Sequence, residues 1–507
     1  MTGIHEQLEQ NPVALSLSKS RIAAFEQCRR RLWLQVHLPQ AATTKQHSAK
    51  ERLKSGTEVG VVARTLVANG ALVEAAPNMQ AALNRTAELI ALADRPIFEA
   101  TLEHDGVLVR IDIFNPVSVD GEPAWELIEV KDSTSCKLYH VSDVATQLWV
   151  AENCGLKIAN ASVRHLNNGF VLKEYGNYAQ LFKDAELYDD AKTIALDRRS
   201  LVQEARTVLG GEQPIWSTGA HCSTPSDCEF VAYCKRLEPK PPEWPIAELP
   251  NTGKKLAGVW AEQQVFDLRE LPEEAPLNAL HQRIRHAVVS GLSYADNTAF
   301  ADAISTWAYP RTWLDFETIS FAIPRWIGTR PWQAVPFQFS AHVETSDGTI
   351  NHVEALDLTG NDPRPMMAEA LAMLPSEGAV IAWNKSYEAT VLRALAQAVP
   401  LHKAALLSLA ERLVDPMPLA KAHYYHPDQR GSFSIKYVLP TIAPELNYQA
   451  LEVSDGMDAQ AAYLEAISPD CTDERRAQID IALRLYCGHD TWAMVVICDR
   501  LSGTHRP

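Results

Sequence analysis

The sequence predicts an α/β protein with two folded domains, and three observations support this. The 507 residues have the composition of a globular protein, with 46% hydrophobic and 22% charged residues. Short runs of alternating apolar residues, typical of strands, lie among longer runs with helical periodicity in both halves. A proline-rich stretch at residues 240–245 separates those halves. We therefore expect domains at residues 1–240 and 306–507, joined by a connector at residues 241–305.

The first domain is expected to contain strands and helices in alternation. Ser18 and Ser20 are candidate N-caps of a first helix, whose apolar pattern runs through Phe25 to Leu34. Further helices are expected at residues 79–93 and 141–151. Three segments with alternating apolar residues predict strands at residues 97–102, 107–114 and 125–131.

The second domain shows the same mixture. Its strand candidates are residues 312–317, 337–343, 352–356 and 379–383, and its helix candidates are residues 366–374, 386–398, 403–413 and 473–499. An α/β arrangement is therefore expected here too.

The charge and hydropathy of the chain restrict its partners. A net charge of −16 argues against nonspecific coating of nucleic acid, which depends on Lys and Arg at phosphates. The basic runs Arg29–Arg31 and Lys45–Lys54 are either phosphate contacts or solvated helix faces. No apolar run approaches the roughly 20 residues of a membrane span, and the polar start is not a secretory signal. We expect a cytoplasmic protein without a membrane partner.

A first group of charged residues lies on two neighbouring predicted strands. Asp112 is on one strand, and Glu129 and Lys131 are on the next. Residues i and i+2 of a strand point to the same face, so Glu129 and Lys131 share one. Carboxylates in pairs favour Mg²⁺ or Mn²⁺, and a nearby lysine can offset charge on a phosphate.

This group resembles the core of PD-(D/E)XK nucleases in their RecB-like branch, which implies a restriction-endonuclease-like domain. Glu99 lies upstream, where that family often has an acid, and Gln147 follows on the helix where RecB-like members carry glutamine. The tyrosine four residues later in the family is Ala151 here. Glu58 lies where many relatives have a histidine ligand. The resemblance implies metal ligands at Asp112, Glu129, Glu58 and Glu99, and catalytic roles for Lys131 and Gln147.

Four of the nine cysteines form a separate pattern. Cys222, Cys228 and Cys234 are each separated by five residues, and Cys28 lies far upstream. Four thiolates can hold a [4Fe–4S] cluster or a structural zinc. The spacing is longer than is usual for zinc fingers, which favours iron–sulfur and leaves zinc as the alternative. One early and three late cysteines around such a core resemble iron–sulfur RecB-like nucleases, in which the cluster is mainly structural. Three unrelated thiols in a loop are the other interpretation.

A second group of acids lies in the C-terminal half. Asp315 and Glu317 share one face of a strand, and Tyr486 and Asp490 share one face of a helix. Glu388 follows a strand that ends at Asn384. Four acids from three segments can bind the two metal ions of a phosphodiester-cleaving site.

The second group resembles ribonuclease H-like exonucleases with DEDD acids of the tyrosine type. The resemblance implies that Asp315, Glu317, Glu388 and Asp490 bind metal and that Tyr486 orients water. The third acid is usually aspartate, whereas this chain has Glu388, and a fold that has lost catalysis is the alternative. Asn384, Ser434 and Lys436 are candidate substrate contacts, and Asp415 is a further candidate acid. Residues 306–500 also resemble a bacterial family known as domain of unknown function 2779.

Together these patterns predict a metal-dependent exonuclease with two candidate centres. DNA is favoured over RNA as the partner, and single-stranded ends over duplex, in repair or in defence against foreign DNA. Three alternatives remain: one active centre beside a binding platform, an iron–sulfur protein that only binds nucleic acid, and a ribonuclease. No protein partner is indicated.

Overall fold

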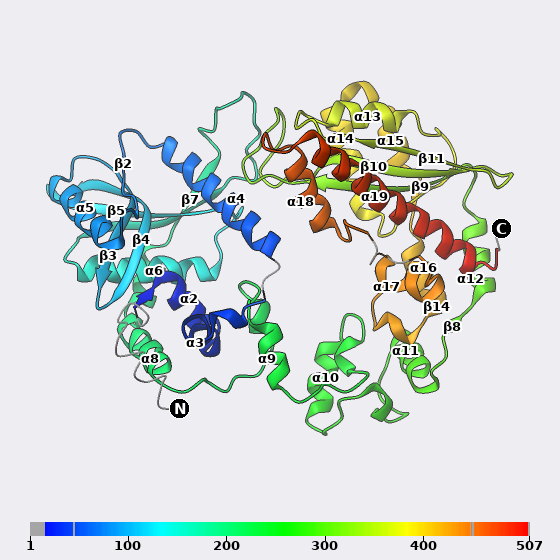
Figure 1. Ribbon diagram of the computed structural model, residues 1–507, viewed down its shortest axis with the longest axis horizontal. Helices are drawn as coiled ribbons and strands as arrows, with labels where there is room; N and C mark the ends of the chain where they lie inside the picture. The colour runs from blue at the N-terminus through cyan, green and yellow to red at the C-terminus, as the bar shows by residue number, and fades with distance from the viewer. Residues whose placement is uncertain (1–15, 44–45, 447, 449–450, 505–507) are drawn as a thin grey trace. The chain divides into compact units, whose positions relative to one another are not determined.

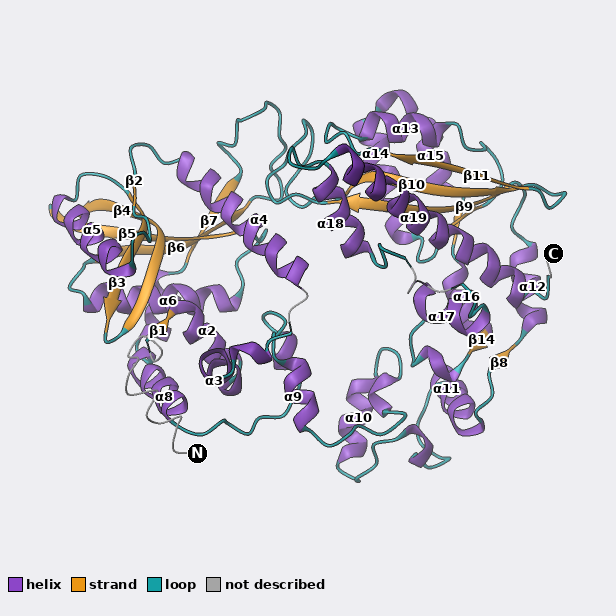
Figure 2. Ribbon diagram, in the orientation of Figure 1, coloured by secondary structure: helices purple, strands orange, loops and turns teal. Residues whose placement is uncertain are grey.

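The computed structural model describes residues 16–43, 46–446, 448 and 451–504, with only the backbone given for residues 46–54. The chain forms two compact units (Figure 1). The first comprises the residues up to Lys240 together with Phe321–Trp332, and the second comprises Pro241–Ser320 and the residues from Gln333. Both units mix helices and strands, so the α/β class is confirmed (Figure 2). Residues 241–305 lie within the second unit.

The first unit is built on a seven-stranded mixed sheet. Its strands, in spatial order, are β2 (Ala71–Leu72), β3 (Ile97–His104), β4 (Val107–Val119), β5 (Glu122–Lys131), β6 (Ile158–Leu166) and β7 (Phe182–Glu186), with β1 (Leu17–Ser18) paired to β4. The segment β3–β4–β5 is an antiparallel meander, and β6 returns parallel to β5. This crossover is made by α6 (Leu138–Asn153), which buries Val144, Ala145 and Leu148 against the sheet.

Two faces of this sheet are covered. Ile111 and Leu127 belong to the main core with α6 and α5 (Met79–Leu92), whereas Ile113 and Ile128 pack with Ala63 of α4 (Gln46–Thr65). The remaining helices of the unit are α2 (Lys19–Gln27), α3 (Arg29–His37), α7 (Tyr188–Ala195), α8 (Arg198–Gly210) and α9 (Val231–Leu237).

The first expected helix is in fact two helices. Ser18 is the N-cap of α2, and its hydroxyl accepts a hydrogen bond from the backbone N–H of Arg21. Cys28 has extended backbone angles, φ −164° and ψ 120°, so it ends α2 and precedes α3. The apolar pattern continues through this break because both helices bury residues in the same unit, including Phe25, Leu32 and Leu34. A periodic pattern alone therefore did not reveal the interruption.

Residues 321–332 complete the first unit from a distant part of the sequence. Ala322 and Ile323 join a buried cluster with Leu166, Phe170, Leu172, Leu181 and Val59. The backbone N–H of Leu172 donates to the carbonyl of Thr329 at 3.0 Å, and that of Gly328 donates to the carbonyl of Leu172 at 2.7 Å. This segment is therefore part of the core of the first unit.

The second unit contains a five-stranded mixed sheet. Its order is β11 (Ile350–Leu356), β10 (Val335–Glu344), β9 (Arg311–Ile319), β12 (Val380–Ile381) and β13 (Leu413–Val414), with β10 antiparallel to β9 and β11 and the last two parallel to β9. Leu314 and Phe316 of β9 pack with α13 (Arg364–Ala372), α14 (Ser386–Ala398) and α15 (Lys403–Glu411). Asp315 and Glu317 alternate with them and therefore face the opposite side, which carries α19 (Asp473–Leu501) and α18 (Gly456–Ala466).

The rest of the second unit is largely helical. It contains α10 (Gly253–Ala261), α11 (Ala279–Ser290), α12 (Asn297–Ser305), α16 (Pro416–His423), α17 (Ile435–Ile442) and the paired strands β8 (Tyr294–Ala295) and β14 (Tyr424–Tyr425). Ile246, Leu268 and Ile284 form a buried cluster with Tyr425 and Phe433. Gly431, at φ +75°, approaches the backbone of Glu248 so closely that only glycine fits. Within the described residues, no helix is long and apolar enough to cross a membrane.

Candidate functional site

The structure brings Asp112, Glu129 and Lys131 together at the carboxyl end of β5, and we call these residues the first centre. The pairing of β4 with β5 reaches Ile113 and Ile128, and beyond it Asp112 Oδ2 accepts a hydrogen bond from the backbone N–H of Val130 at 2.6 Å. Lys131 Nζ lies 2.9 Å from Glu129 Oε1 and 2.6 Å from Asp143 Oδ2. The i, i+2 spacing expected from the strand therefore does place Glu129 beside Lys131.

Two further side chains contact the carboxylate of Glu129, which is 3% exposed. Gln147 Nε2, from α6, donates to Glu129 Oε2 at 2.7 Å and to the carbonyl of Arg110 at 3.0 Å. Lys19 Nζ, at the start of α2, lies 2.5 Å from Glu129 Oε1. Lys19 was not anticipated from the sequence.

The surroundings of the first centre shift the pKa values of its two acids in opposite directions. Burial, followed by the charge of Glu129, raises the pKa of Asp112 to about 7. Burial also pushes the pKa of Glu129 upward, but the ammonium groups of Lys19 and Lys131 outweigh it and hold that pKa below its ordinary value. Burial opposes the charge of Lys131, yet Glu129 and Asp143 raise its pKa. The centre thus holds an ionised Glu129 between two cations.

Glu99 and Glu58 occupy different surroundings. Glu99 forms ion pairs with Arg64 at 2.9 Å and Arg110 at 3.3 Å, in a left-handed backbone conformation with φ +57°. Its charge still contributes to the raised pKa of Asp112. Glu58 lies 3.7 Å from Arg325. Among the described residues, neither joins Asp112 and Glu129 in a group of carboxylates close enough to share one ion.

All four cysteines of the predicted set line one pocket, which we call the cysteine pocket. Cys28 comes from the break between α2 and α3, Cys222 from a short 3-10 helix at Ala220–Ser223, Cys228 from the loop between that helix and α9, and Cys234 from α9. The backbone N–H of Cys228 donates to the carbonyl of Cys222 at 2.7 Å, which holds this loop closed. None of the four is disulfide-bonded.

The three arginines after Cys28 each contact another residue of the first unit. Arg31 lines the pocket and forms an ion pair with Glu229 at 2.8 Å, and Arg29 pairs with Glu204 at 2.8 Å. Arg30 is buried and donates to the carbonyl of Pro214 at 2.7 Å. Arg30 is therefore an internal contact rather than a phosphate contact, whereas the side chain of Arg29 is 49% exposed. The side chains of Lys45 to Lys54 lie outside the described residues.

Burial and nearby arginines act in opposite directions on the pKa values of Cys228 and Cys234. Burial raises the pKa of Cys228 to about 11, against the charge of Arg31. Burial likewise raises the pKa of Cys234, while Arg30 lowers it. Thiols gathered beside fixed positive charge are suited to a bound metal, which would hold them as thiolates.

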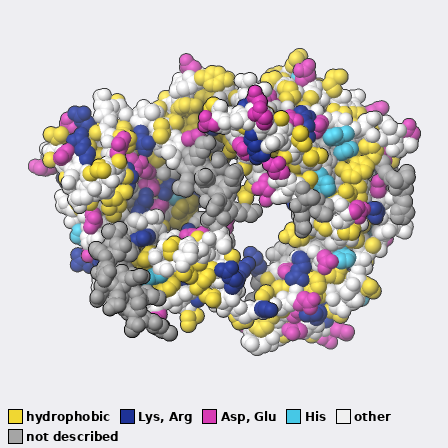
Figure 3. Space-filling model, in the orientation of Figure 1, with side chains coloured by type: hydrophobic (Ala, Val, Ile, Leu, Met, Phe, Trp, Pro, Cys, Tyr) yellow, Lys and Arg dark blue, Asp and Glu magenta, His cyan; other side chains and the backbone are white. Residues whose placement is uncertain are grey.

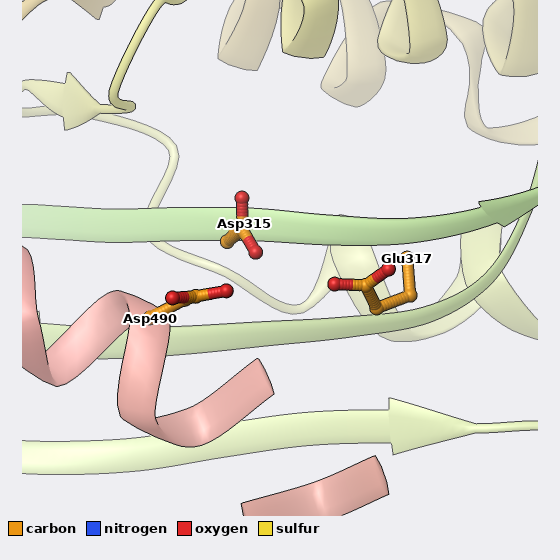
Figure 4. A group of neighbouring side chains, drawn as sticks. All are labelled: Asp315, Glu317 and Asp490. Atoms are coloured by element: carbon orange, nitrogen blue, oxygen red, sulfur yellow. The ribbon is translucent and has the colours of Figure 1, made fainter. Parts of the chain in front are cut away.

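In the second unit, Asp315, Glu317 and Asp490 converge from β9 and α19 (Figure 4). Each offers a carboxylate oxygen within 4.8 Å of those of the other two, and among the described residues they are the only such group of three or more acids, histidines or cysteines. Together with Glu388 they are called the second centre. Divalent ions with oxygen ligands fit a set of this kind.

Tyr486 lies one helical turn before Asp490 on α19, as the i, i+4 spacing predicts. Its hydroxyl accepts a hydrogen bond from Lys436 Nζ at 3.2 Å, and the same ammonium donates to the carbonyl of Ser454 at 2.6 Å. A second tyrosine, Tyr448, donates to Asp490 Oδ1 at 2.5 Å. Lys436 lies over both rings, 5.3 Å from the centroid of Tyr448 and 5.1 Å from that of Tyr486.

Glu388 lies in the first turn of α14 and is 4% exposed. Its Oε2 atom is buried without a hydrogen-bond partner, which is costly for a carboxylate oxygen unless a cation or water completes it. The charge of Glu388 is among those that raise the pKa of Asp315. Glu388 is therefore close enough to Asp315 to interact with its charge, although outside the 4.8 Å group.

Asp415 has a structural role at this point of the fold. Its carboxylate accepts from the backbone N–H groups of Asn384 at 3.1 Å and Lys385 at 3.3 Å, and it caps α16 through Met417 at 2.9 Å. Asn384 has φ +65°, a conformation that asparagine tolerates better than most residues. Asp415 thus fixes the turn that directs Glu388 inward.

The other candidate contacts lie near these acids with varied exposure. Asn384 and Ser434 are exposed. Tyr387 is 43% exposed, and its hydroxyl lies 2.5 Å from that of Thr318. These side chains are accessible to a substrate, whereas Lys436 is already engaged with Tyr486 and Ser454.

The carboxylates of the second centre have raised pKa values. Burial and the charge of Asp490 raise the pKa of Glu317 to about 8, and burial raises that of Glu388 to about 7. Burial and then the charges of Asp490, Glu317 and Glu388 raise the pKa of Asp315 well above its ordinary value. Burial raises that of Asp490, although Tyr448 and Lys436 oppose it. A divalent ion would replace the protons that these acids otherwise retain.

Sequence comparison finds a similarity to a family whose description states no activity. Residues 312–434 match a family described as "Domain of unknown function (DUF2779)". The match includes Asp315, Glu317 and Glu388 but ends before Tyr486 and Asp490. An uncharacterized protein of Ureaplasma parvum serovar 3, UU173, is 24% identical over 210 residues. The alignment covers 37% of this chain and 30% of that protein, so the chain spans less than two thirds of its relative.

Proposed function

We propose that this protein is a metal-dependent exonuclease that acts on nucleic acid, with DNA favoured. The observation that carries the proposal is the convergence of Asp315, Glu317 and Asp490 beside Tyr486. Three carboxylates that approach one another in a buried site are unfavourable without a cation. A tyrosine hydroxyl one helical turn from the third acid gives the same site a group that can orient an attacking water.

Specific residues of the second centre have distinct roles in this proposal. Asp315, Glu317 and Asp490 would hold Mg²⁺ or Mn²⁺, with Glu388 as the fourth acid. Such an ion supplies charge stabilisation to the phosphate oxygens. Tyr448 fixes the orientation of Asp490, and Lys436 fixes that of Tyr486. The ammonium of Lys436 also offsets negative charge in the site.

The first centre supports a second cleavage site of the PD-(D/E)XK kind. Asp112 and Glu129 lie on adjacent strands beside Lys131, and Gln147 completes the set from the crossover helix. Gln147 Oε1 is buried without a partner, which suits a site that gains a cation or water. The order of α5, β3, β4, β5, α6 and β6 also fits the resemblance to the RecB-like branch.

The cysteine pocket is proposed to bind a [4Fe–4S] cluster, with zinc as the alternative. Its four thiols come from both ends of the first unit, so a bound cluster would tie Cys28 to the segment that carries Cys222, Cys228 and Cys234. Two arginines near the thiols favour a negatively charged thiolate cluster. The role of the cluster is stabilisation rather than catalysis.

Separate disabling of the two centres tests the proposal. Anaerobically purified protein is incubated with end-labelled single-stranded DNA or RNA and Mg²⁺ or Mn²⁺. Asp112→Asn and Asp490→Asn are compared with wild type, and Asp120→Asn, which lies in the turn after β4, is the matched control. A ladder of shortened DNA that weakens in each centre variant, but not in the control, supports two working centres.

The other outcomes separate the alternatives. Loss of cleavage in only one variant assigns a binding role to the other centre. If only RNA is degraded, and cleavage requires the 2′-hydroxyl, the substrate is RNA rather than DNA. Absence of metal-dependent cleavage by wild type that still contains its cluster refutes the nuclease and leaves a binding protein.

A further inference from the structure

Lys19 holds a fixed place beside the first centre. It begins α2 directly after β1, whose two residues pair in parallel with Val107 and Leu108 of β4. Leu17 is fully buried, and Ser18 caps the helix. The backbone of Lys19 is therefore anchored to the strand that carries Asp112, and its side chain reaches Glu129 across 110 positions of sequence.

The two lysines at Glu129 have different attachments. Lys131 contacts two carboxylates, those of Glu129 and Asp143, and the second would still hold it if Glu129 became a metal ligand. Lys19 makes its one described ion pair with Glu129 Oε1, the same oxygen that Lys131 contacts. The side chain of Lys19 is 22% exposed, so part of it is accessible from solvent. Lys19 is thus the cation that is freed when another cation takes that oxygen.

We propose that Lys19 is a catalytic residue of the first centre. When a divalent ion binds there, the side chain of Lys19 leaves Glu129 and then contacts a phosphate of the substrate. This inference rests on the proposed nuclease function of the first centre. It also assigns Lys131 a more constrained role, because Asp143 restrains it. The class of ligand that Lys19 recognises is a nucleic-acid phosphate.

Two measurable consequences have opposite signs. Lys19 competes with a divalent ion for Glu129, so its removal leaves metal affinity unchanged or higher. Its removal also leaves one phosphate without its cation, so nucleic-acid binding weakens and depends less on salt. A residue that merely supported the fold would weaken both. The slope of log affinity against log salt falls by about 0.7 for each phosphate of a single strand that the protein no longer neutralises.

The experiment uses full-length protein with Asp315→Asn and Asp490→Asn, which disable the second centre. Lys19→Gln and Lys19→Arg are introduced into this background, and Lys157→Gln, at an exposed position before β6, is the control. Mn²⁺ binding is followed by the loss of the free-ion resonance signal. Binding of a short single-stranded oligonucleotide is followed by fluorescence anisotropy in Ca²⁺ over a range of salt. Thermal melting reports on the fold.

We expect Lys19→Gln to bind Mn²⁺ at least as tightly as its parent and to lose about 0.7 from the salt slope. Lys19→Arg retains the charge and keeps the slope even if the glutamine variant melts early. An unchanged slope, or weaker Mn²⁺ binding with normal melting, overturns the role of Lys19. If Asp112→Asn leaves Mn²⁺ binding of the parent unchanged, the first centre itself is refuted.

Discussion

At the residue scale, the two centres neutralise buried carboxylates in different ways. Glu129 is held ionised by Lys19 and Lys131, whereas Glu317 and Asp315 lie among other acids and have raised pKa values. Burial of an unpaired carboxylate is costly, so a site without cations retains protons instead. All four acids of the second centre therefore have raised pKa values, whereas in the first centre only Asp112 does.

This difference predicts a pH dependence for the second centre. The pKa values of Glu388 and Glu317, raised to about 7 and about 8, exceed the ordinary value of 4.5 that they would have when unfolded. Between the unfolded and the folded pKa values, the unfolded chain therefore binds fewer protons than the folded chain. The free energy of unfolding of the metal-free protein consequently falls as pH rises from about 5 to about 8. Melting in chelator should show this decline, and Mn²⁺ should raise the midpoint more at pH 8 than at pH 6.

The variant Glu317→Gln provides the control for this prediction. The amide cannot ionise, so the decline of melting temperature with pH should become shallower. An unchanged slope would show that other groups cause it.

The two tyrosines of the second centre should differ in their effects. Tyr486→Phe removes the hydroxyl proposed to orient water, and a positioned proton-transfer group contributes roughly 10²–10⁴-fold to rate. Tyr448→Phe removes only the hydrogen bond to Asp490, which is worth about 1.5–3 kcal/mol for a charged acceptor. We expect a loss of at least 100-fold in turnover for the first variant, and of about 10- to 150-fold, mainly in Mn²⁺ affinity, for the second.

Steady-state rates at saturating and limiting Mn²⁺ separate these effects. Excess Mn²⁺ should rescue Tyr448→Phe but not Tyr486→Phe. The reverse pattern would exchange the proposed roles of the two tyrosines.

At the element scale, short interruptions place the functional groups. The break at Cys28 between α2 and α3 puts one thiol opposite the loop that carries the others. The turn held by Asp415 directs Glu388 inward from the start of α14. In each case, a residue with non-helical backbone provides a position that a continuous helix could not.

The cysteine pocket gives a prediction at this scale. Cys228→Ala should abolish binding of the proposed iron–sulfur cluster, or zinc, and lower the melting temperature of the first unit, because loss of a structural metal removes folding free energy. Metal content by mass spectrometry and the visible absorbance of the cluster measure the first effect. Cys136→Ala changes a thiol of the same unit outside the pocket and should leave both readings unchanged. Equal metal in both variants would refute a metal-binding pocket.

At the scale of the whole molecule, the chain enters the first unit a second time after part of the second unit has formed in sequence. The first unit needs Phe321–Trp332, which arrive immediately after β9 and its two acids. On the face drawn in Figure 3, basic and acidic side chains are interspersed over the surface. The net charge of −16 also argues against general electrostatic attraction to nucleic acid.

Because Phe321–Trp332 belong to the first unit, we predict that a residue of this segment stabilises that unit. Ile323 is 8% exposed within the cluster that contains Leu172, and truncation of a buried isoleucine to alanine costs about 2–5 kcal/mol. Ile323→Ala should speed hydrogen exchange at residues 166–182, although these lie in another part of the sequence. Ile327→Ala removes a side chain of the same segment that is 39% exposed and should have little effect. Equal exchange in both variants would show that the segment does not stabilise this unit.

The sequence by itself determined the α/β class, the elements with the clearest periodicity and the spacing of the acids. Strand and helix periodicities depend on local burial, so the expected strands at residues 97–102 and 107–114 coincide with β3 and β4, and residues 386–398 coincide with α14. The i, i+2 and i, i+4 rules likewise placed Glu129 beside Lys131 and Tyr486 beside Asp490. These relations are local, which is why the pattern carries them.

Only the tertiary structure decided which distant residues complete each site. Lys19 reaches Glu129, Tyr448 reaches Asp490 and Asp143 restrains Lys131, and no sequence spacing marks these pairs. Asp415, a candidate acid in the sequence, instead caps a helix, and Arg30 is buried against the carbonyl of Pro214. Such contacts depend on how separate elements pack, because burial brings charges together that are unrelated in sequence.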